Sequence, residues 1–351
     1  MADEERMHLL PIERHGYKDP VLTLPPEIFS EILVHTLPPY PLCSPLTGRA
    51  SPIPLTHVCR RWREIALATP QLWRSIALPF ACTLDYHIRV KQTEAVRTWL
   101  DRSGSCPLSV QIHMEDNNYL SIWAGGWREI PLYRERWEQL EIKATEYALR
   151  SLLACRMPML RSLSLTMEDD SLSHPRVDPR DFPRLQAVSL TLFQSPVDWL
   201  PWGQMTSLTI EDMSSGSYIP ILRDAIHLVD LTLLDCEFFM HSNPESPGSI
   251  PLTQLTSLVI MGSNVVQILG AIDAPALQAL QISGEDLGDE SEDPIDTLAA
   301  LVSRSRCGML RKLLIAGPRL PWVSKKAFRS AFPAIPEIAF KVSFGCEAGR
   351  R

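Results

Sequence analysis

Histidine and cysteine are the side chains that most often carry catalytic or metal chemistry, and both are scattered along this 351-residue sequence. The eight cysteines form no Cys-x-x-Cys pair, and no cluster of cysteine and histidine has the spacing of zinc ligands. The patterns His-Glu-x-x-His, Gly-x-Ser-x-Gly, the Walker loop and the dinucleotide-binding glycine loop are also missing. The sequence therefore predicts neither an enzyme nor a cofactor or metal site. Its isolated cysteines favour a reducing compartment, the cytosol or the nucleus.

Two further groups of side chains suit recognition rather than catalysis. Phe238, Phe239 and Met240 lie in the loop 235–250 and are candidate substrate contacts, although the pattern equally allows them to be tucked under that loop. The stretch 284–293 carries six carboxylates, which favours a solvated loop between repeats over a contact for a basic substrate. Neither group identifies a target protein.

Composition narrows the classes of partner. The formal net charge of −7 gives no basic footprint, which argues against nucleic-acid binding. No apolar run approaches the roughly 18 residues of a membrane-spanning helix, and the acidic N-terminus does not resemble a secretory signal. We therefore expect a soluble protein of the cytoplasm or nucleus whose partners are other proteins.

Two short amphipathic helices are expected near the N-terminus, at 24–33 and 55–66. In the first, Ile28 and Ile32 lie one turn apart, and so do Phe29 and Leu33, which gives a wide apolar stripe. The second has a similar row made of Val58, Trp62 and Ala66. Helices this short are marginal alone, and apolar surface in excess of what one pair can hide usually indicates a partner.

Three blocks of residues in this region resemble the F-box, the motif that docks onto the Skp-family adaptor of cullin-RING ubiquitin ligases. The blocks are Leu24-Pro25-x-Glu27-Ile28, Val58-Cys59-Arg60-x-Trp62 and Pro70-x-Leu72-Trp73, and they occur in order within residues 20–78. The resemblance implies a set of residues that contact the adaptor or support the contact: Leu24, Pro25, Pro26, Ile28, Ile32, Leu33, Leu55, Val58, Cys59, Trp62, Ile65, Pro70, Leu72 and Trp73. The alternative is a helical hairpin packed on the rest of the same chain.

The segment 36–54 separates the two helices and is longer than the turn of an ordinary F-box. Its six prolines exclude a helix, so it is expected to form an exposed loop. Similar insertions are familiar from the expanded F-box families of mushroom-forming fungi.

Beyond residue 100 the sequence repeats the pattern apolar-x-x-apolar-x-apolar eight times. The central apolar positions lie 20 to 33 residues apart, mostly within the range of about 20–29 that is typical of leucine-rich repeats. The repeated triplets are Trp137/Leu140/Ile142, Leu160/Leu163/Leu165, Leu185/Val188/Leu190, Met205/Leu208/Ile210, Leu228/Leu231/Leu233, Leu255/Leu258/Ile260, Leu277/Leu280/Ile282 and Leu310/Leu313/Ile315. Each predicts a short strand with two apolar side chains on one face, and stacked units of this kind form a solenoid.

Flanking segments extend this pattern. Strands are expected around Ile76 and Val110 with a helix at 93–100 between them, further helices at 146–155, 219–226, 265–272 and 295–302, and a terminal helix and strand at 324–332 and 338–342. The strand residues between the buried positions, mostly small and uncharged, are expected to face the concave side. The family's turn asparagine or cysteine is matched at Cys236 alone.

The sequence as a whole predicts an α/β fold, in which a short helical F-box module precedes a curved leucine-rich-repeat-like solenoid with a parallel sheet. The expected parts are a flexible tail at 1–19, the F-box-like domain at 20–78, a transition at 79–136, the solenoid at 137–316 and a cap and tail at 317–351. The resemblance implies the substrate-recognition subunit of a Skp–cullin–F-box ubiquitin ligase, which binds the adaptor and, through it, a cullin and a RING subunit. A repeat scaffold that works outside a ligase is the alternative.

Overall fold

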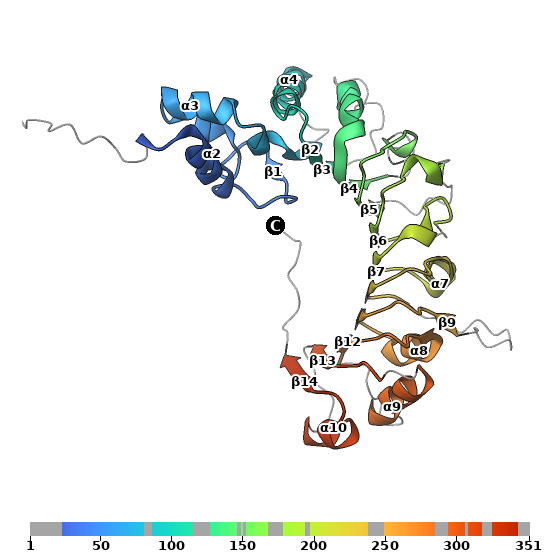
Figure 1. Cartoon of the computed structure of the whole chain (residues 1–351). Coiled ribbons are helices and arrows are strands. Elements are labelled where there is room, and N and C mark those ends of the chain that lie inside the picture. The colour runs from blue at the N-terminus through green and yellow to red at the C-terminus, as the bar shows by residue number, and fades with distance from the viewer. Residues whose placement is uncertain are drawn as a thin grey trace, which may run out of the picture.

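The chain forms a curved array of parallel strands in a computed structural model (Figure 1). The residues that the structure describes are 23–80, 86–114, 127–145, 149, 152–167, 178–193, 197–237, 249–284, 294–305, 308–317 and 325–342. The strands line the inner side of the arc, and helices lie along its outer side (Figure 1). The predicted α/β class and the solenoid-like arrangement are therefore confirmed.

One 12-stranded sheet runs through the array in the order β1-β2-β3-β4-β5-β6-β7-β8-β10-β12-β13-β14, and every neighbouring pair in it is parallel. A second, two-stranded parallel sheet pairs β9 with β11. The strands are β1 (Ser44–Pro45), β2 (Ser75–Phe80), β3 (Leu108–Met114), β4 (Trp137–Ala144), β5 (Ser162–Met167), β6 (Ala187–Thr191), β7 (Ser207–Glu211), β8 (Asp230–Leu234), β9 (Ile250–Pro251), β10 (Ser257–Met261), β11 (Ile272–Asp273), β12 (Ala279–Ser283), β13 (Lys312–Gly317) and β14 (Glu337–Val342).

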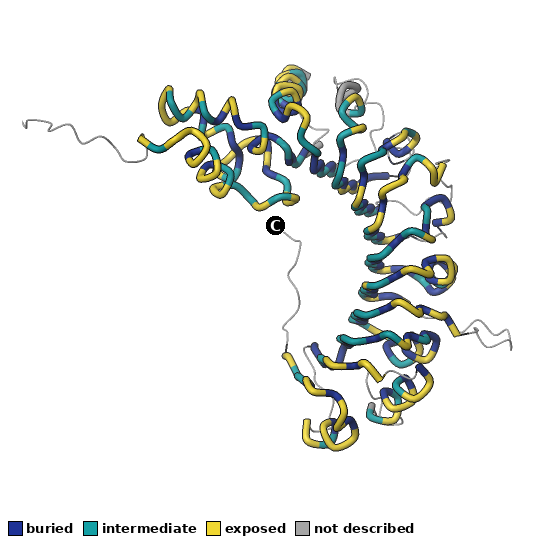
Figure 2. Tube along the Cα trace, in the orientation of Figure 1, coloured by how far each residue is buried: buried dark blue, intermediate teal, exposed yellow. Residues whose placement is uncertain are grey.

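The core lies between the sheet and the outer helices. All eight predicted apolar triplets are buried, and the residues between their members are more exposed, so the strands alternate as expected (Figure 2). Leu163, Leu165 and Leu190, for example, are fully enclosed, and each buried leucine of this kind contributes roughly 1.5–3 kcal/mol through the area it removes from water. Trp199 and Trp202, between β6 and β7, are buried as well.

The helices of the described chain match most of the expected segments. They are α2 (Pro26–His35), α3 (Arg60–Leu67), α4 (Tyr86–Arg102), α7 (Ser215–Asp224), α8 (Val265–Ala271), α9 (Pro294–Arg304) and α10 (Lys325–Ala331), with short 3₁₀ helices η1 (Ile53–His57), η2 (Pro70–Trp73), η3 (Trp127–Arg136), η4 (Pro179–Asp181) and η5 (Trp202–Gln204). In the expected helix 146–155, Leu149, Leu152 and Leu153 are helical and buried, and part of the segment lies outside the described residues. No helix in the described part of the chain is both long enough and apolar enough to span a membrane.

Left-handed turns follow three successive strands, β6, β7 and β8. Leu192, Asp212 and Asp235 have φ between 48° and 65°, and the backbone N–H of each donates to a carbonyl of the next strand at 2.9–3.1 Å. The turn after β10 holds Gly262 at φ 98°, where an added Cβ would lie 2.8 Å from the Cα of Asp235. Glycine is therefore required where two turns approach each other this closely.

The turn position that usually holds asparagine in leucine-rich repeats is filled by buried apolar side chains, Phe193 and Met213, in two of these turns. Cys236 occupies the same position in the next turn, where its thiol lies 3.4 Å from the carbonyl oxygen of Leu234 and 3.5 Å from that of Ile210. The thiol of Cys236 thus lies within hydrogen-bonding distance of the turn backbone, whereas apolar side chains pack at the same position of the other two turns.

The second N-terminal helix is shorter than predicted. The segment 55–66 is divided into η1 and α3 by Val58 and by Cys59, whose backbone is extended (φ −156°, ψ 175°). Prolines 52 and 54 favour the tight 3₁₀ turn before the break, since proline fixes φ and donates no hydrogen bond. The prediction of one continuous helix was therefore wrong, because apolar spacing alone does not locate such a break.

The insert 36–54 contains no α-helix, as predicted, but it is not an exposed loop. Its residues Ser44 and Pro45 form β1, which pairs with Ile76 and Ala77 of β2 and so begins the long sheet. Leu46 is buried in the common core, and the Ser51 hydroxyl donates to its carbonyl oxygen at 3.2 Å. The insert therefore covers the edge of β2, which would otherwise expose unpaired backbone groups.

Candidate functional site

Helix α2 presents apolar side chains on two different faces. Phe29 and Leu33 are buried, whereas Ile28 and Ile32 are exposed at 52 % and 43 % of their surface. Each pair is spaced one helical turn apart, so each forms a separate row along the helix. The row of Ile28 and Ile32 is covered by nothing in the described chain and faces solvent.

The inner face of α2 packs on α3 and η2. The ring of Phe29 meets that of Trp62 edge to face, with 5.1 Å between the ring centroids. The guanidinium of Arg61 donates to the carbonyl oxygen of Leu24 at 2.7 Å, and the indole N–H of Trp73 donates to that of Ala66 at 2.9 Å. These contacts fix α2 against the start of the solenoid and so hold its outer row in place.

The break between η1 and α3 exposes Val58 and Cys59. Arg63 bridges this break, since its Nε donates to the carbonyl oxygen of Thr56 at 2.7 Å. Leu67, at the end of α3, is a further exposed apolar side chain. Leu67 does not belong to the row of Val58, Trp62 and Ala66. The one-turn spacing of that row therefore did not identify Leu67.

The residues that the sequence grouped as one adaptor-binding set fall into three classes of exposure. Exposed are Pro25, Pro26, Ile28, Ile32, Val58 and Cys59; intermediate are Leu24, Leu55, Trp62, Ile65 and Pro70; buried are Leu33, Leu72 and Trp73. The first class is available for contact, and the third belongs to the core. The substrate candidates Phe238, Phe239 and Met240, and the acidic residues 285–293, lie outside the described residues.

A second candidate site is a pocket on the concave face, at the N-terminal end of the sheet. Its volume is about 470 Å³, within the range of roughly 300–1,000 Å³ that is usual for ligand sites. The insert forms one wall, and strands β3, β4 and β5 form the floor. The lining residues are Pro38, Pro41, Leu42, Cys43, Ser109, Val110, Gln111, Gln139, Leu140, Glu141, Ser162 and Ser164.

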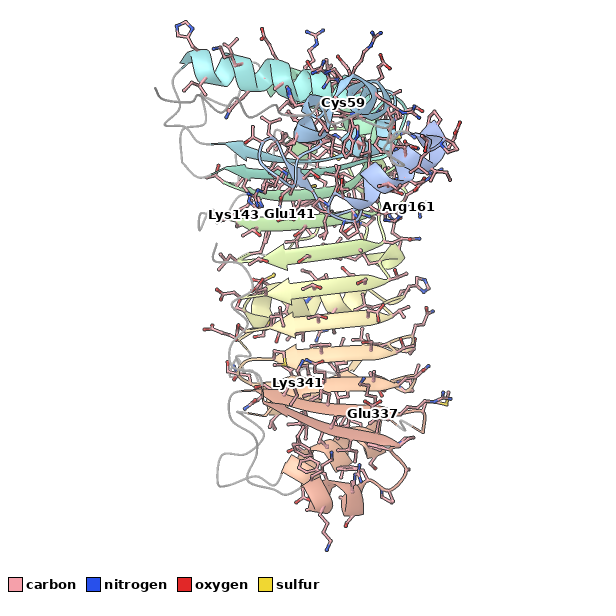
Figure 3. All side chains as sticks on the ribbon, turned by 90° about the vertical axis from the view of Figure 1, so that its left-hand side faces the viewer. Cys59, Glu141, Lys143, Arg161, Glu337 and Lys341 are labelled. Atoms are coloured by element: carbon pink, nitrogen blue, oxygen red, sulfur yellow. The ribbon has the colours of Figure 1, made fainter. Side chains whose placement is uncertain are left out.

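Glu141 is the charged centre of this floor. Gln111 Nε2 donates to its Oε1 at 2.9 Å, and the same oxygen lies 3.0 Å from His113 Nε2. The hydrogen bond from His113 holds the pKa of Glu141 below its usual value, against the opposing effect of partial burial. Figure 3 looks onto the concave face and shows Glu141 and Lys143 on the same strand, with Arg161 near the other end of the strands.

Polar contacts hold the insert against this part of the sheet. The Tyr40 hydroxyl donates to Glu138 Oε2 at 2.8 Å, and the guanidinium of Arg74 lies 4.1 Å from the centroid of the Tyr40 ring. Glu138 also pairs with Arg161, with 3.1 Å between Oε1 and Nε. Burial raises the pKa of Tyr40, so the phenol keeps the proton that it donates. The Ser109 hydroxyl adds a bond of 2.6 Å to a carbonyl oxygen of the insert.

The pocket also contains a thiol, Cys43, whose Sγ lies 3.3 Å from the Ser109 hydroxyl oxygen. Burial raises the pKa of Cys43, so this thiol stays protonated and is a weak nucleophile. The described residues contain no group of three or more histidine, cysteine or carboxylate side chains that could hold a metal ion.

Glu141 and Gln111 were missed by sequence reasoning, although a signal for them was present. The same alternation that placed Ser162 and Ser164 on the concave face also places these two residues there, because they flank the buried Ile142 and Ile112. Leu42 offered no signal, since no periodic pattern covers the insert.

A scan of the chain against protein-family models finds no match, and a search of the curated proteins finds no similar one.

Proposed function

We propose that this protein is the substrate-recognition subunit of a Skp–cullin–F-box ubiquitin ligase. In this proposal the N-terminal module binds a Skp-family adaptor, which brings a cullin and a RING subunit, while the solenoid holds a target protein. The chain itself carries out no bond chemistry. It raises the effective concentration of the target near a ubiquitin-conjugating enzyme that carries ubiquitin. The compartment that suits this role is the cytoplasm or the nucleus.

The observation that carries the proposal is the exposed row of Ile28 and Ile32 on α2. Two isoleucines one turn apart on an ordered helix leave apolar surface in water, and such surface usually marks a contact. The F-box resemblance implies that this row is the side of the helix that contacts the adaptor. The packing of Phe29 and Leu33 supports the same division, since it fixes which face of α2 is free.

The concave face supports the second half of the proposal. Its central row runs through Gln111, Glu141, Ser164, Ser189, Thr209 and Thr232, which are paired in register on successive strands. A broad, polar and mostly uncharged surface of this kind suits recognition of a protein surface, and it lacks the basic stripe of a nucleic-acid binder.

The test is adaptor binding by the full chain and by two matched variants. Replacing Ile28 and Ile32 together with Asp should weaken binding of a purified Skp-family adaptor at least tenfold, because each buried isoleucine contributes roughly 1.5–3 kcal/mol. Ile226→Asp is the control, since Ile226 is also 52 % exposed but lies on the solenoid. Isothermal titration calorimetry measures the affinities, and the control should bind like the wild-type chain.

Absence of adaptor binding by the wild-type chain would overturn the proposal. Binding of the adaptor without recruitment of a cullin–RING pair would favour the alternative, a repeat scaffold that works outside a ligase. Equal binding by the double variant would place the docking surface away from α2.

A further inference from the structure

The pocket beside the insert is not needed for adaptor docking, which uses the outer row of α2. It lies on the concave face, between the insert and strands β3, β4 and β5. The insert residues that form its wall are Pro38, Pro41, Leu42 and Cys43, so this chain builds the pocket from the very segment that lengthens its helical module. A ligand of this pocket would therefore bind at a site separate from the adaptor surface.

The floor of the pocket offers hydrogen-bond acceptors that have no partner. Oε1 of Glu141 lies within hydrogen-bonding distance of both Gln111 and His113, and Oε2 has no partner among the described residues. The hydroxyls of Ser162 and Ser164 and the amide of Gln139 also form no hydrogen bond within the described chain. These groups converge on one hollow and leave several acceptor positions open.

The charge of the pocket has one sign. Among the described residues that line it, Glu141 and Cys43 are the ionisable ones, and the buried thiol of Cys43 is neutral. Lys143 lies on the same face of β4 two residues beyond Glu141, yet the carboxylate bonds to His113 instead. An anionic ligand would therefore meet an ionised carboxylate, whereas a cation would be attracted by it.

The rim of the pocket is apolar. Leu42 is 60 % exposed at the pocket wall, beside Pro38 and Pro41. A long aliphatic side chain with a charged end matches this arrangement, because its stem covers apolar surface while its end reaches a polar floor.

We propose that this pocket binds an arginine side chain of a target protein, with the guanidinium on Glu141 and the stem against Leu42. Arginine fits better than lysine, because its planar group presents five donors in a fixed fork and the floor offers several separate acceptors. Arginines that enter pockets of this kind often dominate protein interfaces. That the arginine belongs to a target protein rests on the proposed function. The affinity of the pocket for guanidinium groups does not depend on it.

The experiment measures binding of small probes to the full chain by saturation-transfer-difference NMR. N-acetyl-arginine-N-methylamide should bind with a dissociation constant in the millimolar range, and the lysine analogue should bind more weakly. The citrulline analogue has the same shape without the charge, and it should bind at least tenfold more weakly than the arginine probe.

Two variants test the residues, and one serves as a matched control. Glu141→Gln should weaken arginine binding at least tenfold, and Leu42→Ser should weaken it severalfold by removing the rim. Glu211→Gln removes a carboxylate from the same concave face on β7, outside the pocket, and should bind like the wild-type chain.

Equal binding of arginine and citrulline probes, or unchanged binding by Glu141→Gln, would overturn the proposal. Adaptor affinity is measured on the same Glu141→Gln protein and should be unchanged. If adaptor binding fails in every variant while the arginine probe still binds, the proposed function fails and the pocket stands.

Discussion

At the scale of single residues, exposure separates side chains that the sequence treats alike. Cys59 and Cys236 are both lone cysteines, yet Cys59 is exposed at the break before α3 and Cys236 is buried under a turn of the solenoid. Burial raises the pKa of Cys236 to about 11. The two thiols should therefore differ in their access to reagents.

Alkylation with iodoacetamide at pH 8 tests this difference. Cys59 should be modified faster than Cys236, because Cys59 is exposed, the thiolate is the reactive form and the buried Cys236 keeps its proton at this pH. Half-buried Cys155 is an internal reference of intermediate reactivity. Peptide mass spectrometry follows each site over time. Equal rates at Cys59 and Cys236 would contradict the structure.

The same raised pKa predicts how Cys236 affects stability. Between the unfolded-state pKa of about 8.5 and the folded-state value of about 11, the unfolded chain loses the thiol proton and the folded chain keeps it. The folded state then binds more protons, so the contribution of Cys236 to stability is complete below the lower pKa and is lost as the pH rises through the higher one.

Adding the adaptor should also protect Cys59 from alkylation if the exposed break is part of the docking surface.

At the scale of elements, the insert is the part of the chain whose role is decided by packing. Leu46 is buried in the core, whereas Leu42, four residues earlier, is exposed. A proline-rich segment with one buried and one exposed leucine is anchored at a defined point. From composition alone, the absence of an α-helix in the insert was predicted correctly and its exposure was predicted wrongly. Prolines restrict the backbone geometry, but they do not determine which tertiary contacts the segment makes.

Alanine substitutions of these two leucines measure how firmly the insert is anchored. Leu46→Ala should lower the free energy of unfolding by about 2–5 kcal/mol, the usual range for a buried leucine, as measured by urea denaturation. Leu42→Ala should change it by less than about 0.5 kcal/mol, as is usual at exposed positions. Two small and equal effects would mean that the insert is a free loop after all.

At the scale of the whole molecule, each unit of the solenoid contacts mainly its neighbours, so damage to one end should stay local. The C-terminal end is closed by α10 and β14, where the ring of Phe328 lies 5.4 Å from Phe340 and 6.5 Å from Phe332, centroid to centroid. Phe328 is fully buried. The helix and strand expected here are confirmed.

Phe328→Ala should therefore destabilise the C-terminal end without affecting the N-terminal module. Loss of a buried phenylalanine costs about 3–5 kcal/mol. Backbone amides of β13 and β14 should exchange faster with deuterium, while those of α2 and α3, and the affinity for the adaptor, should not change. Lys325→Ala, at an exposed site in the same helix, is the control. Faster exchange throughout the chain would show that the solenoid unfolds as one unit.

The sequence by itself determined the strands of the eight repeats and the inward side of each, whereas it predicted none of β1, β9 and β11. Apolar pairs such as Leu163 and Leu165 alternate with polar residues, and a strand has only two faces, so the pattern leaves one arrangement. The helical patterns located the helices of the described solenoid, although α4 begins at Tyr86, seven residues before the expected start.

Only the tertiary structure decided which row of α2 is free, where the second helix breaks, and that the insert meets the concave face. Ile28 and Phe29 are adjacent and similarly apolar, so nothing local distinguishes the outward row from the inward one; the ring of Trp62, 33 positions away, does. The pocket around Glu141 likewise needs the insert and three strands together. Sites built from distant segments depend on packing, which no periodicity along the chain records.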